Sequence, residues 1–371
     1  MKRRHGFSCA PAATSALLAL FPALQVLTTT ADVDPFAFFQ PTLTLRSDDR
    51  RRLDRGDPIV RVVPGDASEV AVFAAVPIEI DGDRLVAWMR RIEELKQNSR
   101  VLAIGRFSDP PRIEDLAELS LDDEDLSAIR SCQPGRCGLK LTADEIAELR
   151  RVTAGAGQDW KSLLQQAFRT MVLNRVNAYR AGGLAALPPY ADDGDGDVWP
   201  STAFATLLGH SVFLSERLPA FVEHLSGRTP LPDVESFVYW SKERLARKAI
   251  ISATHVSIMR TPDERMPDAL VSGKEIFATH YVNASLGLTT IIRGGDGSHN
   301  YLAYLNRSEI DVLGGMFGGL VRSVLERRLR IEAVDVLQGL RRRLEGGEPA
   351  GIEQGIASRR PLRSAPLPAH K

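Results

Sequence analysis

Several side chains of the sequence are reactive types, but most lack the spacing that a known reaction requires. Gly209-His210-Ser211 places a base beside a nucleophile, although adjacent residues do not by themselves bring a hydroxyl within reach of an imidazole. The chain has neither a Gly-x-Ser-x-Gly elbow nor a His-Glu-x-x-His pair, the patterns of a serine hydrolase and a zinc peptidase. Asp193, Asp195 and Asp197 have the spacing of calcium ligands, without the glycine and glutamate that complete an EF-hand loop. The sequence therefore predicts no metal and no cofactor, and whether the protein is an enzyme stays open.

Glycines at positions 314, 315, 318 and 319 interrupt an apolar helical period that begins at Ile310. They do not form Gly-x-Gly-x-x-Gly, and a phosphate loop needs its glycines before the helix rather than inside it. Each glycine costs a helix about 1 kcal/mol, which indicates that a sheet, a partner helix or a ligand packs closely there. Gly318 is therefore a candidate ligand contact.

Two cysteines flank a turn in Cys132-Gln133-Pro134-Gly135-Arg136-Cys137. Pro-Gly folds the chain back and can bring the two sulfurs together, so we expect a disulfide in an oxidising compartment. A redox pair or two zinc ligands are the alternatives. Redox pairs have two intervening residues, and no second pair with zinc spacing lies nearby.

The N-terminus has the layout of a secretory signal. Lys2, Arg3 and Arg4 precede an uncharged apolar stretch, and Ala31 is the best cleavage position. We expect residues 1–31 to be removed and the protein to work in the periplasm or outside the cell, with an uncleaved anchor as the alternative. The remaining chain loses three of its 47 basic residues against 47 acidic ones, a net charge of −3, which predicts no nucleic-acid partner. No second long apolar run predicts a spanning helix in the mature chain.

The remaining periodicity predicts an α+β protein. We expect a linker or short helix at 32–57, one domain at 58–345 with a helical insertion at 112–230, and a disordered tail at 346–371. Predicted strands cover 58–64, 69–80, 101–107, 234–240, 248–259, 270–282, 286–293 and 301–306. Predicted helices cover 83–97, 121–129, 142–152, 160–179, 201–208, 215–225 and 308–344.

Polar residues inside or beside the predicted strands are the candidate ligand contacts. On a one-sided sheet they would simply face solvent, but if the sheet curves round a cavity, alternate residues point inward and orient a mostly apolar ligand. With the helical glycine, the candidates are Tyr239, Lys242, His255, His280, Tyr281, Tyr301, Arg307 and Gly318.

This order of elements resembles the helix-grip fold of START-related lipid-transfer domains, over 69–107 and 234–344. The resemblance implies an antiparallel curved sheet that wraps a long C-terminal helix and leaves a cavity for a hydrophobic or lipid-like molecule. The stretch from Cys132 to Leu141 is also similar to uncharacterised exported bacterial proteins with a Cys-x4-Cys helical insertion, which implies no activity. The expectation is thus an exported lipid-binding protein. A hydrolase-type enzyme using strand-borne histidine and acidic residues, or a structural or interaction module, remains the alternative.

Overall fold

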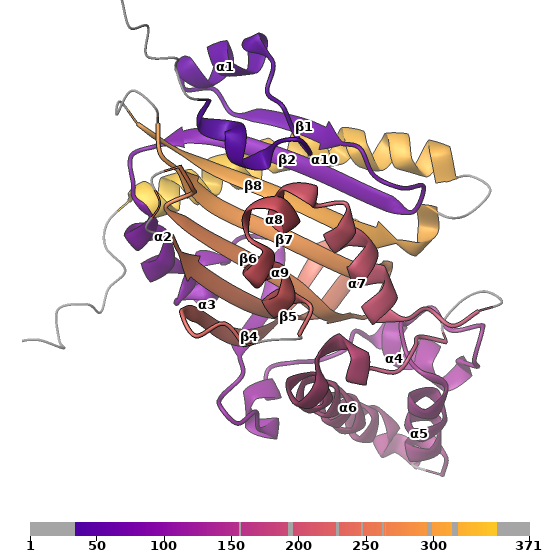
Figure 1. Cartoon of the computed structure of the whole chain (residues 1–371). Coiled ribbons are helices and arrows are strands. Elements are labelled where there is room, and N and C mark those ends of the chain that lie inside the picture. Colours follow the sequence, from indigo (N-terminus) through magenta and orange to yellow (C-terminus); the bar gives the residue numbers. More distant parts are fainter. Residues whose placement is uncertain are drawn as a thin grey trace, which may run out of the picture. The chain divides into compact units, whose positions relative to one another are not determined.

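The structure is a computed structural model that describes residues 34–155, 157–191, 196–227, 230–245, 248–261, 263, 265–294, 299–313 and 318–346. Within these residues the protein is α+β and has one eight-stranded antiparallel sheet, in the order β1-β2-β8-β7-β6-β5-β4-β3 (Figure 1). The strands are β1 (Ile59–Val63), β2 (Glu69–Ile78), β3 (Val101–Arg106), β4 (Val234–Leu245), β5 (Lys248–Arg260), β6 (Ala269–Ala278), β7 (Val282–Ile292) and β8 (Asn300–Ile310).

The pairing of β2 with β8 joins the beginning of the domain to its end. It runs through ten residue pairs, from Glu69 with Glu309 to Ile78 with Asn300. β1 and β3 are the edge strands, so the other six strands are paired on both sides. Because side chains alternate along a strand, each strand presents one set of residues to each face of the sheet.

Three helices lie on one side of the sheet, which we call the α10 face. They are α2 (Gly82–Met89), α3 (Ile92–Leu95) and α10 (Gly318–Glu345). Leu337 and Leu344 of α10 are buried in one apolar cluster with Val76, Val271 and Leu302 of the sheet. Among the described helices, none is long and apolar enough to cross a membrane.

The sheet curls toward α10. The N-terminal half of α10 packs on β1 and β2, in a cluster where Val321 and Leu325 contact Val70 and Val72. Yet Arg100, just before the opposite edge strand β3, donates a hydrogen bond to Glu332 of the same helix over 2.9 Å. Eight strands at about 4.8 Å spacing would separate the two edges by roughly 34 Å in a flat sheet. Leu325 and Glu332 lie only about 10 Å apart along the helix, so the two edges can both reach this part of α10 only if the sheet bends around it.

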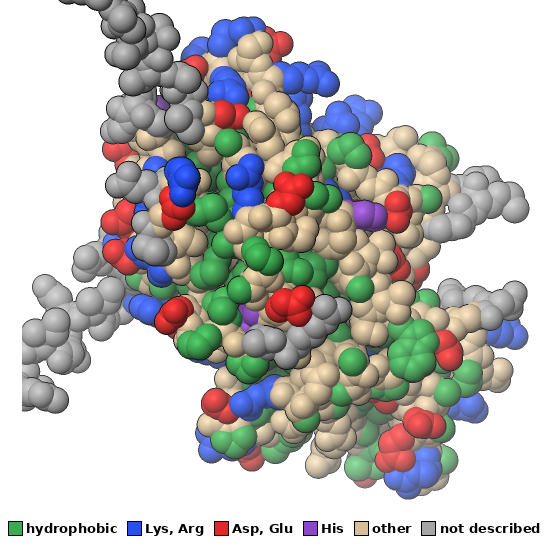
Figure 2. Space-filling model, viewed as in Figure 1, with side chains coloured by type: hydrophobic (Ala, Val, Ile, Leu, Met, Phe, Trp, Pro, Cys, Tyr) green, Lys and Arg blue, Asp and Glu red, His purple; other side chains and the backbone are tan. Residues whose placement is uncertain are grey.

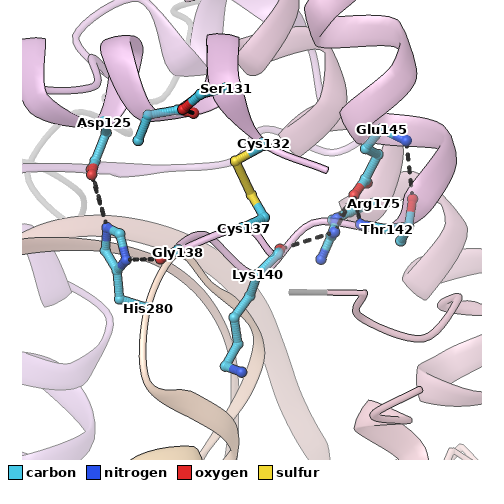
Figure 3. Close-up of a disulfide and its surroundings, with 11 residues drawn as sticks. Asp125, Ser131, Cys132, Cys137, Gly138, Lys140, Thr142, Glu145, Arg175 and His280 are labelled. Carbon is cyan, nitrogen blue, oxygen red and sulfur yellow. Dashed lines mark hydrogen bonds and ion pairs between the residues drawn. A yellow bond between two sulfur atoms is a disulfide. The ribbon is translucent and has the colours of Figure 1, made fainter. Parts of the chain in front are cut away.

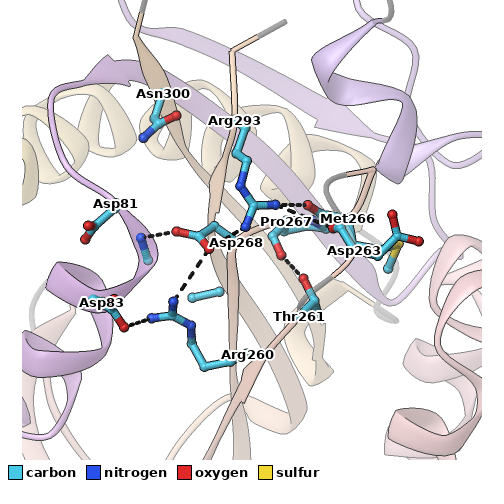
Figure 4. Close-up of polar contacts among 12 residues, drawn as sticks. Asp81, Asp83, Arg260, Thr261, Asp263, Met266, Pro267, Asp268, Arg293 and Asn300 are labelled. Atoms are coloured by element: carbon cyan, nitrogen blue, oxygen red, sulfur yellow. Dashed lines mark hydrogen bonds and ion pairs between the residues drawn. The ribbon is translucent and has the colours of Figure 1, made fainter. Parts of the chain in front are cut away.

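Asp268 ties α2 to the strand ends (Figure 4). Its carboxylate accepts hydrogen bonds from the Gly82 backbone N–H at 2.5 Å and from Arg293 at 2.6 Å. A Cβ atom on Gly82 would lie only 2.7 Å from Asp268 Oδ2, so the close approach requires glycine. This contact fixes where α2 begins over the α10 face.

The other side of the sheet, which we call the insertion face, is covered by helices from the segment between β3 and β4. Figure 1 shows α7, α8 and α9 lying over the central strands, with α4, α5 and α6 beside them. Figure 2 views this face, where hydrophobic side chains show across the centre between scattered charged ones. The helices are η2 (Ile113–Leu116), α4 (Asp123–Ser131), α5 (Ala143–Thr153), η3 (Gly157–Asp159), α6 (Trp160–Gly182), η4 (Gly183–Ala186), α7 (Pro200–Gly209), α8 (Val212–Arg217) and α9 (Pro219–Leu225). Before the sheet, η1 (Pro35–Phe39) and α1 (Ser47–Asp54) occupy the expected linker, and η5 (Asp311–Leu313) follows β8.

The predicted disulfide is present. Cys132 follows α4 and bonds to Cys137 across a turn closed by the Gln133 N–H and the Arg136 carbonyl, with Cα atoms 4.6 Å apart (Figure 3). Both cysteines are buried in the core of the insertion face. The bond therefore fixes the turn that connects α4 to α5.

The structure corrects three predicted boundaries. The helix expected from Ser308 begins at Gly318, because β8 continues to Ile310 and pairs with β2 through Glu309. The helix expected at 83–97 is two helices, and the one expected at 215–225 breaks where Pro219 starts α9. Residues 1–31, the tail from 347, and the glycines at 314 and 315 lie outside the described residues.

Candidate functional site

Of the eight side chains proposed as ligand contacts from the sequence, Tyr239 lies on the α10 face. Lys242 and His255 point to the insertion face, where Lys242 pairs with Asp122 at 2.6 Å and His255 Nδ1 lies 2.7 Å from the Tyr179 hydroxyl. The buried Lys242 ammonium thus anchors the insertion to the sheet.

Tyr301 and Arg307 also point to the insertion face. The Tyr301 ring packs on Phe36 with centroids 5.0 Å apart, and the buried Arg307 guanidinium pairs with the buried carboxylate of Glu69. Both positions hold the N-terminal segment and β2 against β8.

The remaining three candidates lie at element ends. His280 Nδ1 donates to the Gly138 carbonyl at 2.7 Å and its Nε2 faces the Asp125 carboxylate at 3.1 Å, to one side of the disulfide (Figure 3). Tyr281 follows with a left-handed backbone, φ 64°. A Cβ on Gly318 would come 2.0 Å from the Leu313 carbonyl oxygen, so backbone packing accounts for this glycine. The eight candidates do not converge on one site.

A polar cluster does form on the α10 face around Lys96. The Lys96 ammonium, at the end of α3, donates to Glu243 over 2.6 Å and to the Tyr239 hydroxyl over 3.2 Å. Ser241, between them on β4, also donates to Glu243 over 2.6 Å. Burial opposes the Glu243 charge, but Lys96 and Ser241 outweigh it and hold the pKa of Glu243 below its usual range. Burial likewise opposes the charge of Lys96, yet Tyr239 and Glu243 raise its pKa.

Glu275 of β6 faces the same cluster, but its carboxyl group forms no ion pair with a described lysine or arginine. Burial, followed by the nearby charge of Glu243, raises the pKa of Glu275 from 4.5 to about 8, against the opposing effect of Lys96. A carboxyl group with this pKa is mostly protonated at neutral pH and can donate a hydrogen bond. Its side chain makes no hydrogen bond with another described residue.

Tyr304 of β8 completes the cluster from four strands away. Burial raises the pKa of Tyr304 to about 12, and Lys96, Tyr239 and Glu243 all lie close enough to influence it. β4 and β8 would be about 19 Å apart in a flat sheet, so this proximity again reflects the curl. The curl therefore collects two tyrosines, two carboxyls and one lysine into what we call the Lys96 cluster: Lys96, Tyr239, Glu243, Glu275 and Tyr304.

The sheet surface around this cluster carries mostly small, polar side chains. On the α10 face of β5 to β8, half-buried side chains alternate with buried neighbours that point to the insertion face. The half-buried positions are Ser252, Thr254, Gly273, Glu275, Ser285, Gly287, Thr289, Tyr304, Asn306 and Ser308. Among them, Asn306 donates to Ser285 over 3.1 Å, and Ser308 donates to Asn306 over 2.9 Å.

Two glycines on this surface show which atoms would lie nearest to an added side chain. A Cβ on Gly273 would meet only Thr254 at 3.5 Å, and the atoms nearest to one on Gly287 would be those of Tyr304 and Asn306, at 3.6 Å or more. These are ordinary contacts with the same sheet, and none of these nearest atoms belongs to α10. The atoms nearest to these two glycines are thus those of the sheet itself. A separate hollow of about 520 Å³ is lined by α10 residues alone, Ser323, Glu326, Arg327, Arg330 and Ile331, on the side of the helix that carries the exposed Arg327 and Ile331.

The apolar half of the same face carries one further unpaired group. Trp88 of α2 is buried in the cluster with Leu337 and Leu344, and its indole N–H has no acceptor among the described residues. Buried polar groups normally have a partner, so this donor is available to a ligand or a water molecule.

A second polar network lies on the insertion face under α9. His224 Nε2 lies 3.0 Å from the Ser257 hydroxyl, and the Lys274 ammonium donates to the Leu225 carbonyl over 2.7 Å. Burial lowers the pKa of Lys274 to about 8 and, reinforced by the charges of Lys274 and His224, the pKa of His255 to about 3. Ser257 is fully buried, so this serine and histidine pair has no access for a substrate. The network holds α9 to the sheet.

Among the described residues, no three histidine, cysteine, aspartate or glutamate side chains gather in a way that could hold a metal ion. Asp193 and Asp195 lie outside the described residues.

The sequence missed Lys96, Glu275 and Tyr304. A period of two along β4 would have grouped Tyr239 with Glu243 and set Lys242 apart on the other face, because adjacent strand residues point to opposite sides. Nothing local indicated that Lys96, on a short helix, would reach β4.

No family model and no curated protein matches the chain. A solved structure, TTHA0849 from Thermus thermophilus, matches 39% of this chain and 88% of its own at 12% identity, with a TM-score of 0.23.

Proposed function

We propose that the α10 face binds a small molecule with an apolar body and an uncharged polar head, in an arrangement of the helix-grip kind. The observation that carries this proposal is the half-buried surface of mostly small, polar side chains on β5 to β8, where the atoms nearest to a Cβ on Gly273 or Gly287 belong to the sheet rather than to α10. Ligand pockets are mostly apolar with a few converging polar groups, and this face combines both.

The order of elements supports the helix-grip arrangement. Apart from the edge strand β1, the sheet runs β2-β8-β7-β6-β5-β4-β3, with α2 and α3 between the first two of these strands in the chain and α10 after the last. The sheet bends around α10, as the Arg100 contact with Glu332 requires. We place the ligand between these two layers.

The composition of the Lys96 cluster favours a ligand whose polar head group is uncharged. Lys96 and Glu243 already neutralise one another at 2.6 Å, so neither offers a free charge to a ligand. The protonated Glu275 and the hydroxyls of Tyr239 and Tyr304 are hydrogen-bond donors, which suit an ester or amide carbonyl or a hydroxyl group. The apolar cluster around Val271, Leu302 and Leu337 would receive the body of the molecule.

Native mass spectrometry of protein purified from its own host tests the proposal. We expect a co-purified apolar molecule, and we expect Gly273→Leu to lose it, because the leucine would extend into the space above β6. Gly209→Leu is the matched control, since a Cβ there meets nothing within 4 Å and the position lies at the end of α7, outside the α10 face. Equal loss from both variants, or an empty wild-type protein that takes up no added lipid, would contradict the proposal.

We also propose that the protein is exported and works outside the cytoplasm, with cleavage near Ala31. The disulfide between Cys132 and Cys137 supports this compartment, because structural disulfides persist in oxidising surroundings. N-terminal sequencing of the exported protein should begin near Asp32. An intact Met1 on membrane-held protein would overturn the proposed cleavage.

A further inference from the structure

The outer face of α10 carries apolar side chains that nothing in the described structure covers. Leu320, Val324 and Ile331 are 69%, 61% and 61% exposed. At 100° per residue, these positions fall within about 40° of one another around the helix, so they form one stripe. Exposed apolar side chains gathered on one face are typical of a surface that meets a partner.

The charges beside this stripe are basic. Arg327 and Arg328 are exposed between Val324 and Ile331, and Arg330 is exposed next to them. Arg327 makes no hydrogen bond or ion pair with another described residue. We call Leu320, Val324, Arg327, Arg328 and Ile331 the outer face of α10.

The acidic residues of the same stretch are less exposed than its arginines. Glu326 and Glu332 have side chains 20% and 22% exposed. Glu332 pairs with Arg328 and with Arg100, each at 2.9 Å, and Glu326 lies 3.8 Å from Arg330, so of the three exposed arginines only Arg327 has no described carboxylate partner. α10 as a whole has seven arginines against four acidic residues, a net charge of +3. Residues 347–371, which follow, add four basic and two acidic side chains, a further net charge of +2.

We propose that the outer face of α10 docks on an anionic lipid membrane surface. An apolar stripe flanked by arginine is the pattern of a helix that lies in the interface, where apolar side chains enter the acyl boundary and cations meet lipid phosphates. A second copy of this chain would oppose arginine to arginine across a two-fold contact, and the basic tail would repel the same face. Charge complementarity therefore selects the membrane among these occupants.

The experiment is flotation of the purified mature protein with vesicles of phosphatidylcholine, alone or mixed with phosphatidylglycerol. We expect binding to the mixed vesicles, weakened by salt, and little binding to phosphatidylcholine alone. Replacing Arg327 and Arg328 by glutamine should weaken partitioning about fivefold for each charge removed. Leu320→Ser with Val324→Ser should weaken it on the same vesicles without lowering the melting temperature, because both side chains are already exposed.

Two controls make the result decisive. Arg150→Gln with Arg151→Gln removes two adjacent exposed arginines from α5 and should leave partitioning unchanged. Gly273→Leu should bind vesicles like wild type, because docking does not depend on a ligand in the α10 face. Absence of wild-type binding to anionic vesicles, or equal loss in the α5 control, would overturn the proposal. So would a dimer in sedimentation velocity that Leu320→Ser with Val324→Ser converts to a monomer.

Discussion

The protonated state of Glu275 should make the protein less stable as pH rises. The folded-state pKa is raised from 4.5 to about 8, so between these values the unfolded chain releases a proton that the folded chain keeps. Stability contributed by the protonated form is therefore complete below pH 4.5 and is lost progressively up to about pH 8. The test is Glu275→Gln, which keeps the shape and donor capacity of the protonated acid and cannot ionise.

The expected size follows from the shift. One pKa unit corresponds to about 1.4 kcal/mol, so the shift sets an upper bound of about 5 kcal/mol. Glu275 is half-buried, and its contact with solvent reduces this figure. We expect Glu275→Gln to raise the free energy of unfolding by about 2 kcal/mol at pH 8 and to change it little at pH 4.5.

Urea denaturation at pH 4.5, 6 and 8 measures this difference, with Glu216→Gln on the exposed surface of α8 as the control for a lost carboxylate. The reasoning is refuted if Glu275→Gln is no more stable than wild type at pH 8. It is also refuted if the gain does not grow with pH, because Glu275 would then be ionised and paired in the folded protein.

Three other predictions concern stability and protonation. Reduction of Cys132 and Cys137 should lower the free energy of unfolding by about 2 kcal/mol, the loop-entropy value for so short a loop, and an unchanged urea midpoint with dithiothreitol would contradict it. His255 should stay neutral in NMR titrations down to about pH 4, because burial lowers its pKa from 6.5 to about 3. The stability that the neutral imidazole contributes is therefore complete above pH 6.5 and is lost as the pH falls toward 3. Titration of His255 near pH 6.5 would refute this. Glu69→Gln should cost about 3–5 kcal/mol in urea denaturation, because it leaves the Arg307 charge buried and unpaired, and a cost under about 1 kcal/mol would show that water reaches this pair.

The sequence predicted the elements better than the site. Period-two and helical patterns located the strands and most helices, because these signals depend on which residues must be buried. The boundary at Ser308 was wrong because the pairing of β8 with β2 continues past the point where the apolar helical period begins, and tertiary pairing is not visible in a local pattern.

The candidate residues are scattered over both faces for a related reason. Selecting polar residues in strands ignored which face each side chain takes, and so it joined Tyr239 with Lys242 although they are three residues apart and point to opposite faces. Tyr304 becomes a neighbour of Tyr239 through the curl of the sheet, whereas Lys96 reaches Tyr239 from the end of α3, beside the paired strands β3 and β4. That curl depends on contacts between segments more than 200 residues apart, such as Arg100 with Glu332.

Titration with 1-N-phenylnaphthylamine, an uncharged apolar probe, tests the central claim that the α10 face is a ligand site. Wild-type protein and Gly209→Leu should raise the fluorescence of the probe to the same saturating level at one probe per chain, and Gly273→Leu should lose this signal while melting cooperatively. Equal signals from wild type and Gly273→Leu would contradict the claim, because the probe would then bind somewhere other than the space above β6.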